Sequence, residues 1–157
     1  METHKTNVMR VLDAQDIAYA TASYEVDDSN FDGNLVARKI GLDPDSVFKT
    51  LVCVGDKGSH IVCCIPVTQE LDLKKAAAAV GEKAIEMLKS KDLLGLTGYV
   101  HGGCSPVGMK KQFKTFIHET AAGYEKIFVS AGKVGMQMEL SSKDLIAAVG
   151  MMLADIC

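Results

Sequence analysis

The order of hydrophobic and polar positions along the chain predicts a series of short helices and short strands. Val8, Val11 and Leu12 fall on one face of a helix that ends near Asp16. The other elements indicated by these patterns and by turn residues are, in chain order, a strand over residues 17–26, a helix over residues 35–40 closed by Gly41, a turn at residues 43–45, a helical turn that starts at Ser90 or Asp92 and stops before Gly95, and strands over residues 113–117, 127–130 and 136–140.

The clearest strand signal lies in the first half of the chain. Residues 47–54 and 60–66 are two runs rich in β-branched residues, and the connection between them contains glycine and aspartate. Such a spacing is typical of a β-hairpin. A helix over Leu73–Val80 follows, because Asp72 is a favourable N-terminal cap and Gly81 a favourable C-terminal stop.

The C-terminal segment predicts a final amphipathic helix. Ser141 is a favourable cap, and Leu145, Ala148, Val149 and Met152 lie on one helical face. Across the whole chain the strands are too clustered for a doubly wound sheet, in which strands and helices alternate. We therefore expect an α+β fold with a mixed, barrel-like β-sheet and flanking helices.

Length and composition limit the class of protein. The chain has 157 residues, of which 48% are hydrophobic and 24% charged, and these values fit one globular domain over residues 1–157. No window approaches the ~20 continuous apolar residues of a membrane span, and the first residues lack the apolar core of a signal peptide. The expected location is the cytoplasm, without membrane contact.

The cysteines do not form a metal or disulfide pattern. Their number is odd, their spacing matches no zinc template, and Cys53, Cys63 and Cys64 lie in apolar runs, where cysteine acts as a small hydrophobic residue. We therefore expect reduced thiols and no bound metal. Cys104 differs, because it lies in a glycine-rich stretch shortly after His101. That spacing within a loop is weak support for a nucleophile and its base.

The charge distribution constrains the partners. A net charge of −3 counts against a protein that coats nucleic acid through bulk electrostatics, since such domains are usually strongly basic. Residues 1–32 carry seven acidic and two basic side chains, whereas residues 110–133 carry five basic and two acidic ones. One region could thus face a polyanion although the chain is acidic overall. An ordinary solvated surface is the alternative.

A glycine-rich loop is the first candidate for binding chemistry. Residues 102–108 contain three glycines and one proline, so the backbone can approach a ligand closely and direct N–H groups toward it. The loop lacks the Gly-Lys-Ser/Thr ending of a P-loop and the spacing of a Rossmann fingerprint, and we expect no cofactor. The alternative is a tight surface turn without a binding role.

Two further segments carry polar groups that could form a site together with this loop. Lys49 lies within an apolar strand and shares a face with Leu51 and Cys53, so it either borders a pocket or extends to solvent at an edge. Residues 130–135 form a small turn with one hydroxyl and one amine, for which a plain hairpin turn is the alternative. The residues alone predict a pocket of backbone amides and a lysine. Such a pocket suits a carbonyl, carboxylate or phosphate group, and it contains no protein nucleophile.

Four segments are informative about the family of the chain when they are considered together and in chain order. They are Lys49–Leu51, Leu71–Ala77, Gly98–Lys111 and Ser130–Leu140. Together they resemble the YbaK/EbsC family, whose members are free-standing relatives of the editing domain of prolyl-tRNA synthetase. The resemblance extends from Tyr24 nearly to Asp155, and it implies that the chain is one such editing domain.

The resemblance implies trans-editing of mischarged tRNA. Prolyl-tRNA synthetase attaches cysteine or alanine to tRNA(Pro), because a hydrophobic pocket rejects near-isosteres of its substrate by only ~1–3 kcal/mol. Family members similar to this chain deacylate Cys-tRNA(Pro), and the thiol of the cysteine itself attacks the ester carbonyl. The implied partners are the aminoacylated 3′ end of tRNA(Pro) and prolyl-tRNA synthetase.

The same resemblance implies a set of site residues. Lys49, Gly102 and Gly103 are the expected catalytic residues, and Lys49 matches the family residue most closely tied to activity. Our hypothesis is that backbone N–H groups of Gly102–Ser105 stabilise the oxyanion. The residues that would contact the substrate are Tyr24, Phe31, Cys104, Ser105, Pro106, Ser130, Gly132 and Lys133. Gln137 matches a position that carries aspartate in some relatives, and no acid–base role follows for it.

Three other functions are open at this point. An Ala-tRNA(Pro) deacylase would need a bound water, because alanine has no thiol. A non-catalytic module would dock on prolyl-tRNA synthetase or tRNA without turnover, and a carrier of thiols or amino acids would need only a pocket. Under the editing interpretation, the acidic side chains of residues 1–32 should lie away from a basic rim made of Lys49, Lys110, Lys111 and Lys133.

Overall fold

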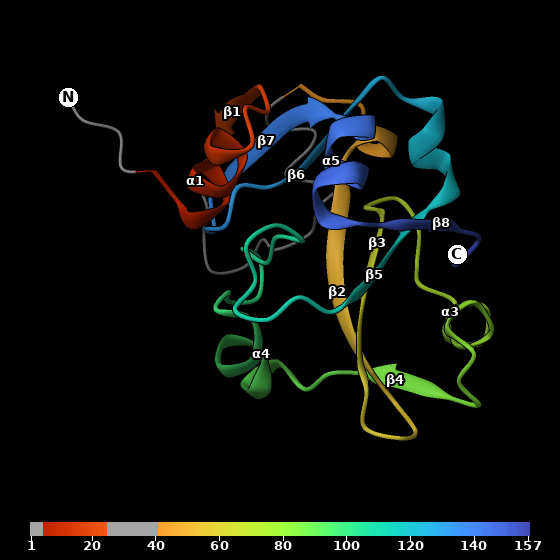
Figure 1. Cartoon of the computed structure of the whole chain (residues 1–157). Helices are drawn as coiled ribbons and strands as arrows, with labels where there is room; N and C mark the ends of the chain where they lie inside the picture. The colour runs from red at the N-terminus through yellow and green to blue at the C-terminus, as the bar shows by residue number, and fades with distance from the viewer. Residues whose placement is uncertain (1–4, 25–40) are drawn as a thin grey trace.

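The computed structural model describes residues 5–24 and 41–157 (Figure 1). Its elements, in chain order, are helix α1 (Asn7–Ala14), strand β1 (Tyr19–Ser23), the 3₁₀ helix η1 (Pro44–Ser46), β2 (Phe48–Gly55), β3 (His60–Pro66), α3 (Leu73–Val80), β4 (Ile85–Met87), α4 (Ser90–Thr97), β5 (Lys114–His118), the 3₁₀ helix η2 (Glu119–Gly123), β6 (Lys126–Ser130), β7 (Met136–Ser141), α5 (Ser142–Val149) and β8 (Met152–Ala154). The expected α+β class is confirmed. The helix expected over residues 35–40 lies outside the described residues.

The described strands form two sheets that are joined at one point. An antiparallel sheet has the order β1-β7-β6, and a second sheet has the order β4-β2-β3-β5-β8. In the second sheet β4, β2 and β3 pair antiparallel, whereas β3, β5 and β8 pair parallel, so this sheet is mixed as expected. Val47, just before β2, bridges Phe128 of β6 in parallel orientation, and β2 and β6 lie side by side. The β-structure therefore runs from β1 to β8 through this bridge.

Figure 1 shows how the two sheets divide the molecule. The three-stranded sheet lies with α1 and α5 at one end, and the tip of the β2–β3 hairpin lies with β4 at the other. The hairpin predicted from the two β-rich runs is thus confirmed, and it forms the long central part of the five-stranded sheet.

Helix boundaries follow the cap residues. Asp72 Oδ1 accepts hydrogen bonds from two backbone N–H groups in the first turn of α3, and Gly81 closes that helix with a φ of +84°. At the start of α5, Ser141 Oγ accepts from the N–H of Asp144 at 3.2 Å. Side-chain oxygens here satisfy N–H groups that have no partner inside the helix, which is why the helices begin where the sequence predicts.

The largest core is shared by both sheets and α1. Its buried side chains include Val8, Leu12, Phe48, Val52, Ile127, Val129, Met138 and Leu140. A smaller cluster on the other face of the five-stranded sheet includes Cys53, Ile61, Cys63, Ile65, Ala76 and Phe116. Because neighbouring residues of a strand point to opposite faces, β2 contributes to both clusters. The buried cysteines pack as small hydrophobic residues, as expected.

The structure corrects three details of the predicted elements. α4 does not stop before Gly95 but continues through it, until Gly98 closes the helix with a φ of +88°. Met152 does not lie on the last helix, since α5 ends at Val149 and Met152 begins β8. The sequence patterns do not indicate β4 and β8, because three residues are too few to show a two-residue period.

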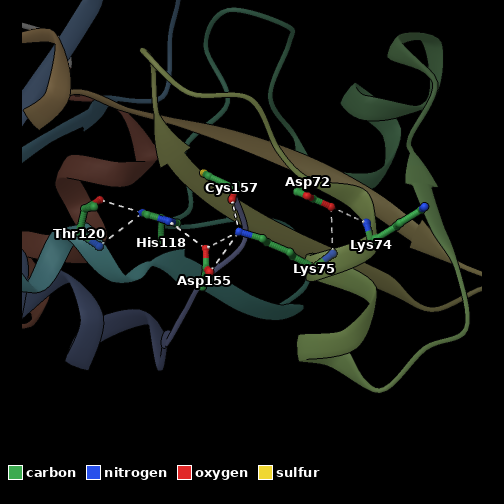
Figure 2. A network of polar contacts seen from close by, with 7 residues as sticks. All are labelled: Asp72, Lys74, Lys75, His118, Thr120, Asp155 and Cys157. Carbon is green, nitrogen blue, oxygen red and sulfur yellow. Dashed lines mark hydrogen bonds and ion pairs between the residues drawn. The ribbon is translucent and has the colours of Figure 1, made fainter.

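Polar contacts fix the C-terminal segment against α3 (Figure 2). Lys75 Nζ donates to both carboxylate oxygens of Asp155, at 3.1 and 3.3 Å, and to the carbonyl of Cys157 at 2.8 Å. Asp155 also lies 3.6 Å from Nε2 of His118, whose Nδ1 is 2.9 Å from Thr120 Oγ1. Since Lys75 lies on α3 and His118 at the end of β5, the chain end connects α3 to the five-stranded sheet.

Candidate functional site

The glycine-rich loop begins with a tight turn. Gly102 has a φ of +86°, a conformation that favours glycine, and the N–H of Gly103 donates to the carbonyl of Val100 at 3.0 Å. Gly102 is exposed, whereas the loop is buried from Gly103 to Val107. The loop is therefore packed into the fold along most of its length.

Hydrogen bonds hold the loop in its conformation. The Tyr99 hydroxyl donates to Val107 O at 2.5 Å, Ser105 Oγ accepts from Val107 N at 3.3 Å, and Asn7 Nδ2 donates to Gly108 O at 2.8 Å. Burial raises the pKa of Tyr99 to about 12, so its hydroxyl stays protonated and can donate at neutral pH. Residues of α1 and residues just after α4 thus support the loop.

Four N–H groups of the loop have no acceptor among the described residues. Within residues 5–24 and 41–157, none lies in hydrogen-bond range of the backbone N–H of Gly102, Cys104, Ser105 or Gly108. The N–H of Gly103, in contrast, is used in the turn. Free backbone amides held close together can bind an anion or an oxyanion. The loop therefore offers donors for such a group at Gly102, Cys104 and Ser105.

The loop packs directly on the turn that follows β6. A Cβ atom at Gly103 would lie 2.8 Å from the backbone nitrogen of Val134 and 2.9 Å from the carbonyl carbon of Lys133. These distances are shorter than real Cβ contacts, so only glycine fits between the two backbones. The loop and the turn, which the sequence indicates separately, are neighbours in the fold.

The turn itself is held by α1 and by Ser130. Ser130 Oγ accepts from the N–H of Gly132 at 3.1 Å, and Thr6 Oγ1 donates to the carbonyl of Ala131 at 2.6 Å. Gly132 has a φ of +98°, and a Cβ there would lie 2.8 Å from a methyl group of Val8. The shape of the turn therefore depends on a glycine packed against the first helix.

Tyr24 reaches the same turn through its backbone. Its N–H donates to the carbonyl of Gly135 at 2.9 Å, immediately beyond the paired residues of β1 and β7. Tyr24 is half-buried, and Lys133 is exposed on the turn. Phe31, the other aromatic residue expected at the site, lies outside the described residues. Tyr24, Ser130, Gly132 and Lys133 are thus brought together around one turn.

A bridge between the sheets brings the strand of Lys49 next to the strand of Ser130. Val47 and Phe128 pair in parallel orientation and pack in one small hydrophobic cluster. Two residues further along each strand, the side chains of Lys49 and Ser130 point to the same side as those of Val47 and Phe128. Ser130 in turn pairs directly with Gln137 of β7. Lys49, Ser130 and Gln137 form a polar row across three neighbouring strands, on the face turned away from the largest core.

The side chain of Lys49 carries a charge without a partner among the described residues. The side chain is half-buried and shares a face of β2 with Leu51 and Cys53, as expected. Among the described residues it forms no ion pair and no hydrogen bond, either with the glycine-rich loop or elsewhere. Burial raises the pKa of the Cys157 thiol, and the nearby charge of Lys49 opposes this rise. The polar row thus contains a cation that could hold an anionic ligand.

The side chains of the middle of the loop are buried in the protein. Cys104 is 8% exposed, and burial raises the pKa of its thiol to about 12. The thiol therefore stays protonated at neutral pH and is a weak nucleophile. Ser105 and Pro106 are buried as well, while His101 is exposed. The side chains of Cys104 and Ser105 are therefore packed into the protein, and only their backbone N–H groups lack a partner among the described residues.

A separate pocket lies between α1, the end of the loop and α5. It has a volume of about 230 Å³, and its lining includes Val11, Pro106, Met109, Phe113 and Val149. In the described parts of the chain, no group of three or more His, Cys, Asp or Glu side chains could hold a metal ion. No helix there is long and apolar enough to cross a membrane.

Gln137 is the member of the polar row to which the sequence assigns no role. Its side chain is 8% exposed, and its Oε1 is buried without a hydrogen-bond partner among the described residues. No local sequence signal marks it, because its burial depends on the pairing of β7 with both β1 and β6.

Comparison with a family model and with a curated relative identifies the family. Residues 34–148 match the model described as an aminoacyl-tRNA editing domain. The chain is 45% identical over 152 residues to the Enterococcus faecalis protein named "Putative Cys-tRNA(Pro)/Cys-tRNA(Cys) deacylase EbsC", and the match covers 97% of this chain and 93% of that protein.

Two more distant similarities also cover nearly the whole chain. The Bacillus subtilis protein named "Uncharacterized protein YwhH" is 24% identical over 145 residues, which are 92% of this chain and 86% of that protein. The crystal structure of "a putative trans-editing enzyme for prolyl tRNA synthetase" superposes with a TM-score of 0.81 at 25% identity and covers 96% of this chain and 94% of that one. The fold is therefore that of an editing domain, and the chain belongs to the YbaK/EbsC family of aminoacyl-tRNA editing domains.

Proposed function

We propose that this protein is a deacylase that removes cysteine from mischarged Cys-tRNA(Pro). The identity of 45% with a relative named for Cys-tRNA(Pro) and Cys-tRNA(Cys) supports this substrate class. The observation in the fold that carries the proposal is the set of free N–H groups at Gly102, Cys104 and Ser105. Fixed amide donors of this kind stabilise the oxyanion that develops on an ester carbonyl.

In the proposed step the substrate supplies its own nucleophile. The cysteine thiol gives up its proton and its sulfur attacks the ester carbonyl carbon, so a C–S bond forms while the C–O bond to the terminal ribose breaks. The proton goes to the departing ribose oxygen, and no external reactant is consumed. The protein orients the thiol and stabilises the oxyanion. This division of roles agrees with a Cys104 thiol that is buried and protonated.

The residues of the site take different parts in this proposal. Lys49 orients the 3′-terminal phosphate or ribose, and Gly102 donates its N–H to the oxyanion. Gly103 has a positioning role. Its own N–H already donates to the carbonyl of Val100, and its lack of a side chain lets the loop contact the turn after β6. Among the described residues, we assign the walls around the aminoacyl ester and the terminal adenosine to Tyr24, Cys104, Ser105, Pro106, Ser130, Gly132 and Lys133. Prolyl-tRNA synthetase, as the source of such mischarged tRNA, is the proposed partner, which places the reaction in the cytoplasm.

A panel of aminoacyl-tRNAs tests the proposal. The purified protein is incubated separately with Cys-tRNA(Pro), Cys-tRNA(Cys), Ala-tRNA(Pro) and Pro-tRNA(Pro), and the loss of each labelled ester is compared with its loss in buffer. We expect rapid loss of the cysteine ester on tRNA(Pro) and a stable proline ester. Preferential loss of alanine would indicate a deacylase that uses bound water. Binding without loss of any ester would indicate a non-catalytic docking module.

The variant Cys104→Ala tests the identity of the nucleophile. If the substrate thiol attacks, this variant keeps the backbone N–H of residue 104 and should still deacylate Cys-tRNA(Pro), with only a partial loss from the changed wall of the pocket. A correctly folded Cys104→Ala protein without activity would instead show that the protein thiol takes part.

A further inference from the structure

A buried amide oxygen lies without a partner in the middle of the three-stranded sheet. Gln137 is on β7, the central strand, and pairs with Ala22 of β1 and with Ser130 of β6. Its side chain is 8% exposed, and no described residue donates a hydrogen bond to its Oε1. Buried acceptors are nearly always paired, because an unpaired one destabilises the folded protein. This oxygen is therefore retained at a cost in stability.

The neighbours of Gln137 belong to the candidate site. Ser130, directly opposite on β6, accepts a hydrogen bond from the N–H of Gly132 at 3.1 Å within the turn that contacts the glycine-rich loop. Lys49 lies on the neighbouring strand β2, and its side chain points to the same side. The polar row therefore carries a cation on β2 and a neutral acceptor on β7, with β6 between them.

We propose that Gln137 Oε1 accepts a hydrogen bond from the α-ammonium group of the aminoacyl ester and so determines specificity at this site. The proposal rests on the deacylase function proposed above. Next to its scissile bond, an aminoacyl ester carries a carbonyl, which the free loop amides can bind, and an α-ammonium group, which can only donate. Lys49 is itself a cation and would repel that group, whereas a carboxamide oxygen accepts from it.

A neutral acceptor at this position selects for a free α-amine. The hydrogen bond between an ammonium group and Oε1 is charge-assisted, and it is lost when the amine is acylated. Peptidyl-tRNA and N-acylated aminoacyl-tRNA carry an acyl group on this nitrogen. Gln137 would therefore favour aminoacyl-tRNA over these related esters, which an editing enzyme must leave intact.

The variant Gln137→Met tests this role, because methionine has a similar length and no comparable hydrogen-bonding group. We expect kcat/KM for Cys-tRNA(Pro) to fall about 10- to 100-fold, and kcat/KM for N-acetyl-Cys-tRNA(Pro) to change less than about twofold. Gln137→Glu keeps an acceptor oxygen and should retain most of the activity on the free-amine substrate. Gln15→Met, at the exposed C-terminal end of α1, is the matched control and should behave like the wild-type protein on both substrates.

Thermal unfolding separates this role from a structural one. Removal of a buried, unpaired acceptor is neutral or stabilising, so Gln137→Met should keep or raise the Tm. The proposal is overturned if Gln137→Met loses the same factor on both substrates, if it keeps the wild-type kcat/KM for Cys-tRNA(Pro), or if its Tm falls clearly.

A binding measurement distinguishes failure of this proposal from failure of the deacylase function. The probe is 3′-cysteinylamino-3′-deoxyadenosine, an amide in place of the ester, and its N-acetyl form is the comparison. If the wild-type protein leaves Cys-tRNA(Pro) intact but binds the free-amine probe more tightly, and Gln137→Met removes this preference, the deacylase function fails and the role of Gln137 stands. If the wild-type protein does not prefer the free-amine probe, the role of Gln137 is wrong whatever the catalytic result.

Discussion

Lys49 places a positive charge within a strand whose other residues are mostly apolar. It is half-buried and has no ion-pair partner among the described residues. A partly buried charge without a partner does not stabilise a fold, because its lost hydration is not replaced. A bound anion would replace that hydration, and in the editing proposal this anion is the 3′-terminal phosphate of the tRNA.

The variant Lys49→Ala should therefore lose activity without losing stability. We expect kcat/KM for Cys-tRNA(Pro) to fall at least about tenfold, as for a lost contact with a charged group, while the Tm changes little. Lys57→Ala, at the exposed tip of the β2–β3 hairpin, is the control and should keep the wild-type kcat/KM. Wild-type activity in Lys49→Ala would contradict the proposed role of this lysine.

At the scale of elements, the contact between the glycine-rich loop and the turn after β6 depends on Gly103. In Gly103→Ala the new Cβ would meet two backbone atoms at less than 3.0 Å, so one of the two segments has to move. We expect the free energy of unfolding to fall by ~1–3 kcal/mol. Deacylation should fall as well, because the free N–H groups move with the loop. Unfolding and activity assays on one protein preparation measure both effects.

A matched glycine lies in α4. Gly95→Ala introduces a Cβ with no heavy atom within 4 Å, and the residue is helical. This control should keep full activity and raise the free energy of unfolding by up to ~1 kcal/mol, since alanine favours helix over glycine. If Gly103→Ala were as stable and active as Gly95→Ala, the close packing of loop and turn would be refuted.

The C-terminal contacts shown in Figure 2 give the fold a pH-dependent element. The hydrogen bond from Lys75 is the main cause that lowers the pKa of Asp155 below its usual value of 3.8, and His118 adds to the effect. A carboxyl group whose pKa is lower in the folded state stabilises the fold above its unfolded pKa, and this stabilisation is lost as the pH falls through the folded pKa.

Asp155→Asn should therefore lower the Tm at neutral pH by a small amount, because the contact is exposed and screened by solvent. The difference from the wild-type protein should shrink as the pH falls below 3.8, and it should vanish once Asp155 is protonated in the folded protein. Melting curves over a range of pH measure this effect. A Tm difference that stays constant down to acidic pH would show that Asp155 acts through packing instead.

The elements also show how far the sequence alone predicts this fold. Caps and turns act on their immediate neighbours, so α3, the β2–β3 hairpin and the start of α5 are predicted correctly. Pairing between distant segments leaves no local trace. The glycine-rich loop and the turn after β6 are recognisable as candidates, but their contact at Gly103 is not. Likewise, the approach of β2 to β6 and the burial of Gln137 follow only from how the strands are arranged.

At the scale of the whole molecule, the net charge of −3 limits how the protein can hold tRNA. Lys110, Lys111 and Lys133 are exposed and could flank the 3′ end of a bound tRNA. Among the residues described near the N-terminus, Lys5 is paired with Asp13 and adds no free positive charge. We therefore expect contact with few phosphates, and selection of the tRNA body is left to a partner such as the synthetase.

The salt dependence of deacylation tests this view of the whole surface. For single-stranded nucleic acid, the logarithm of affinity falls with the logarithm of salt concentration by about 0.7 for each phosphate contacted. With about two contacts, kcat/KM for Cys-tRNA(Pro) should fall less than tenfold between about 50 and 200 mM salt. A loss of about a thousandfold would indicate a broad electrostatic interface that the net charge argues against.

The most direct test of the central claim is the single-turnover rate at which the protein releases the amino acid from Cys-tRNA(Pro) and from S-methyl-Cys-tRNA(Pro). S-methylation blocks attack of the sulfur on the ester and enlarges the side chain by only one methyl group. We predict rapid release of cysteine by the wild-type protein, and release of S-methylcysteine no faster than in buffer. Equal rapid release of both amino acids, or no release of cysteine, would contradict the account.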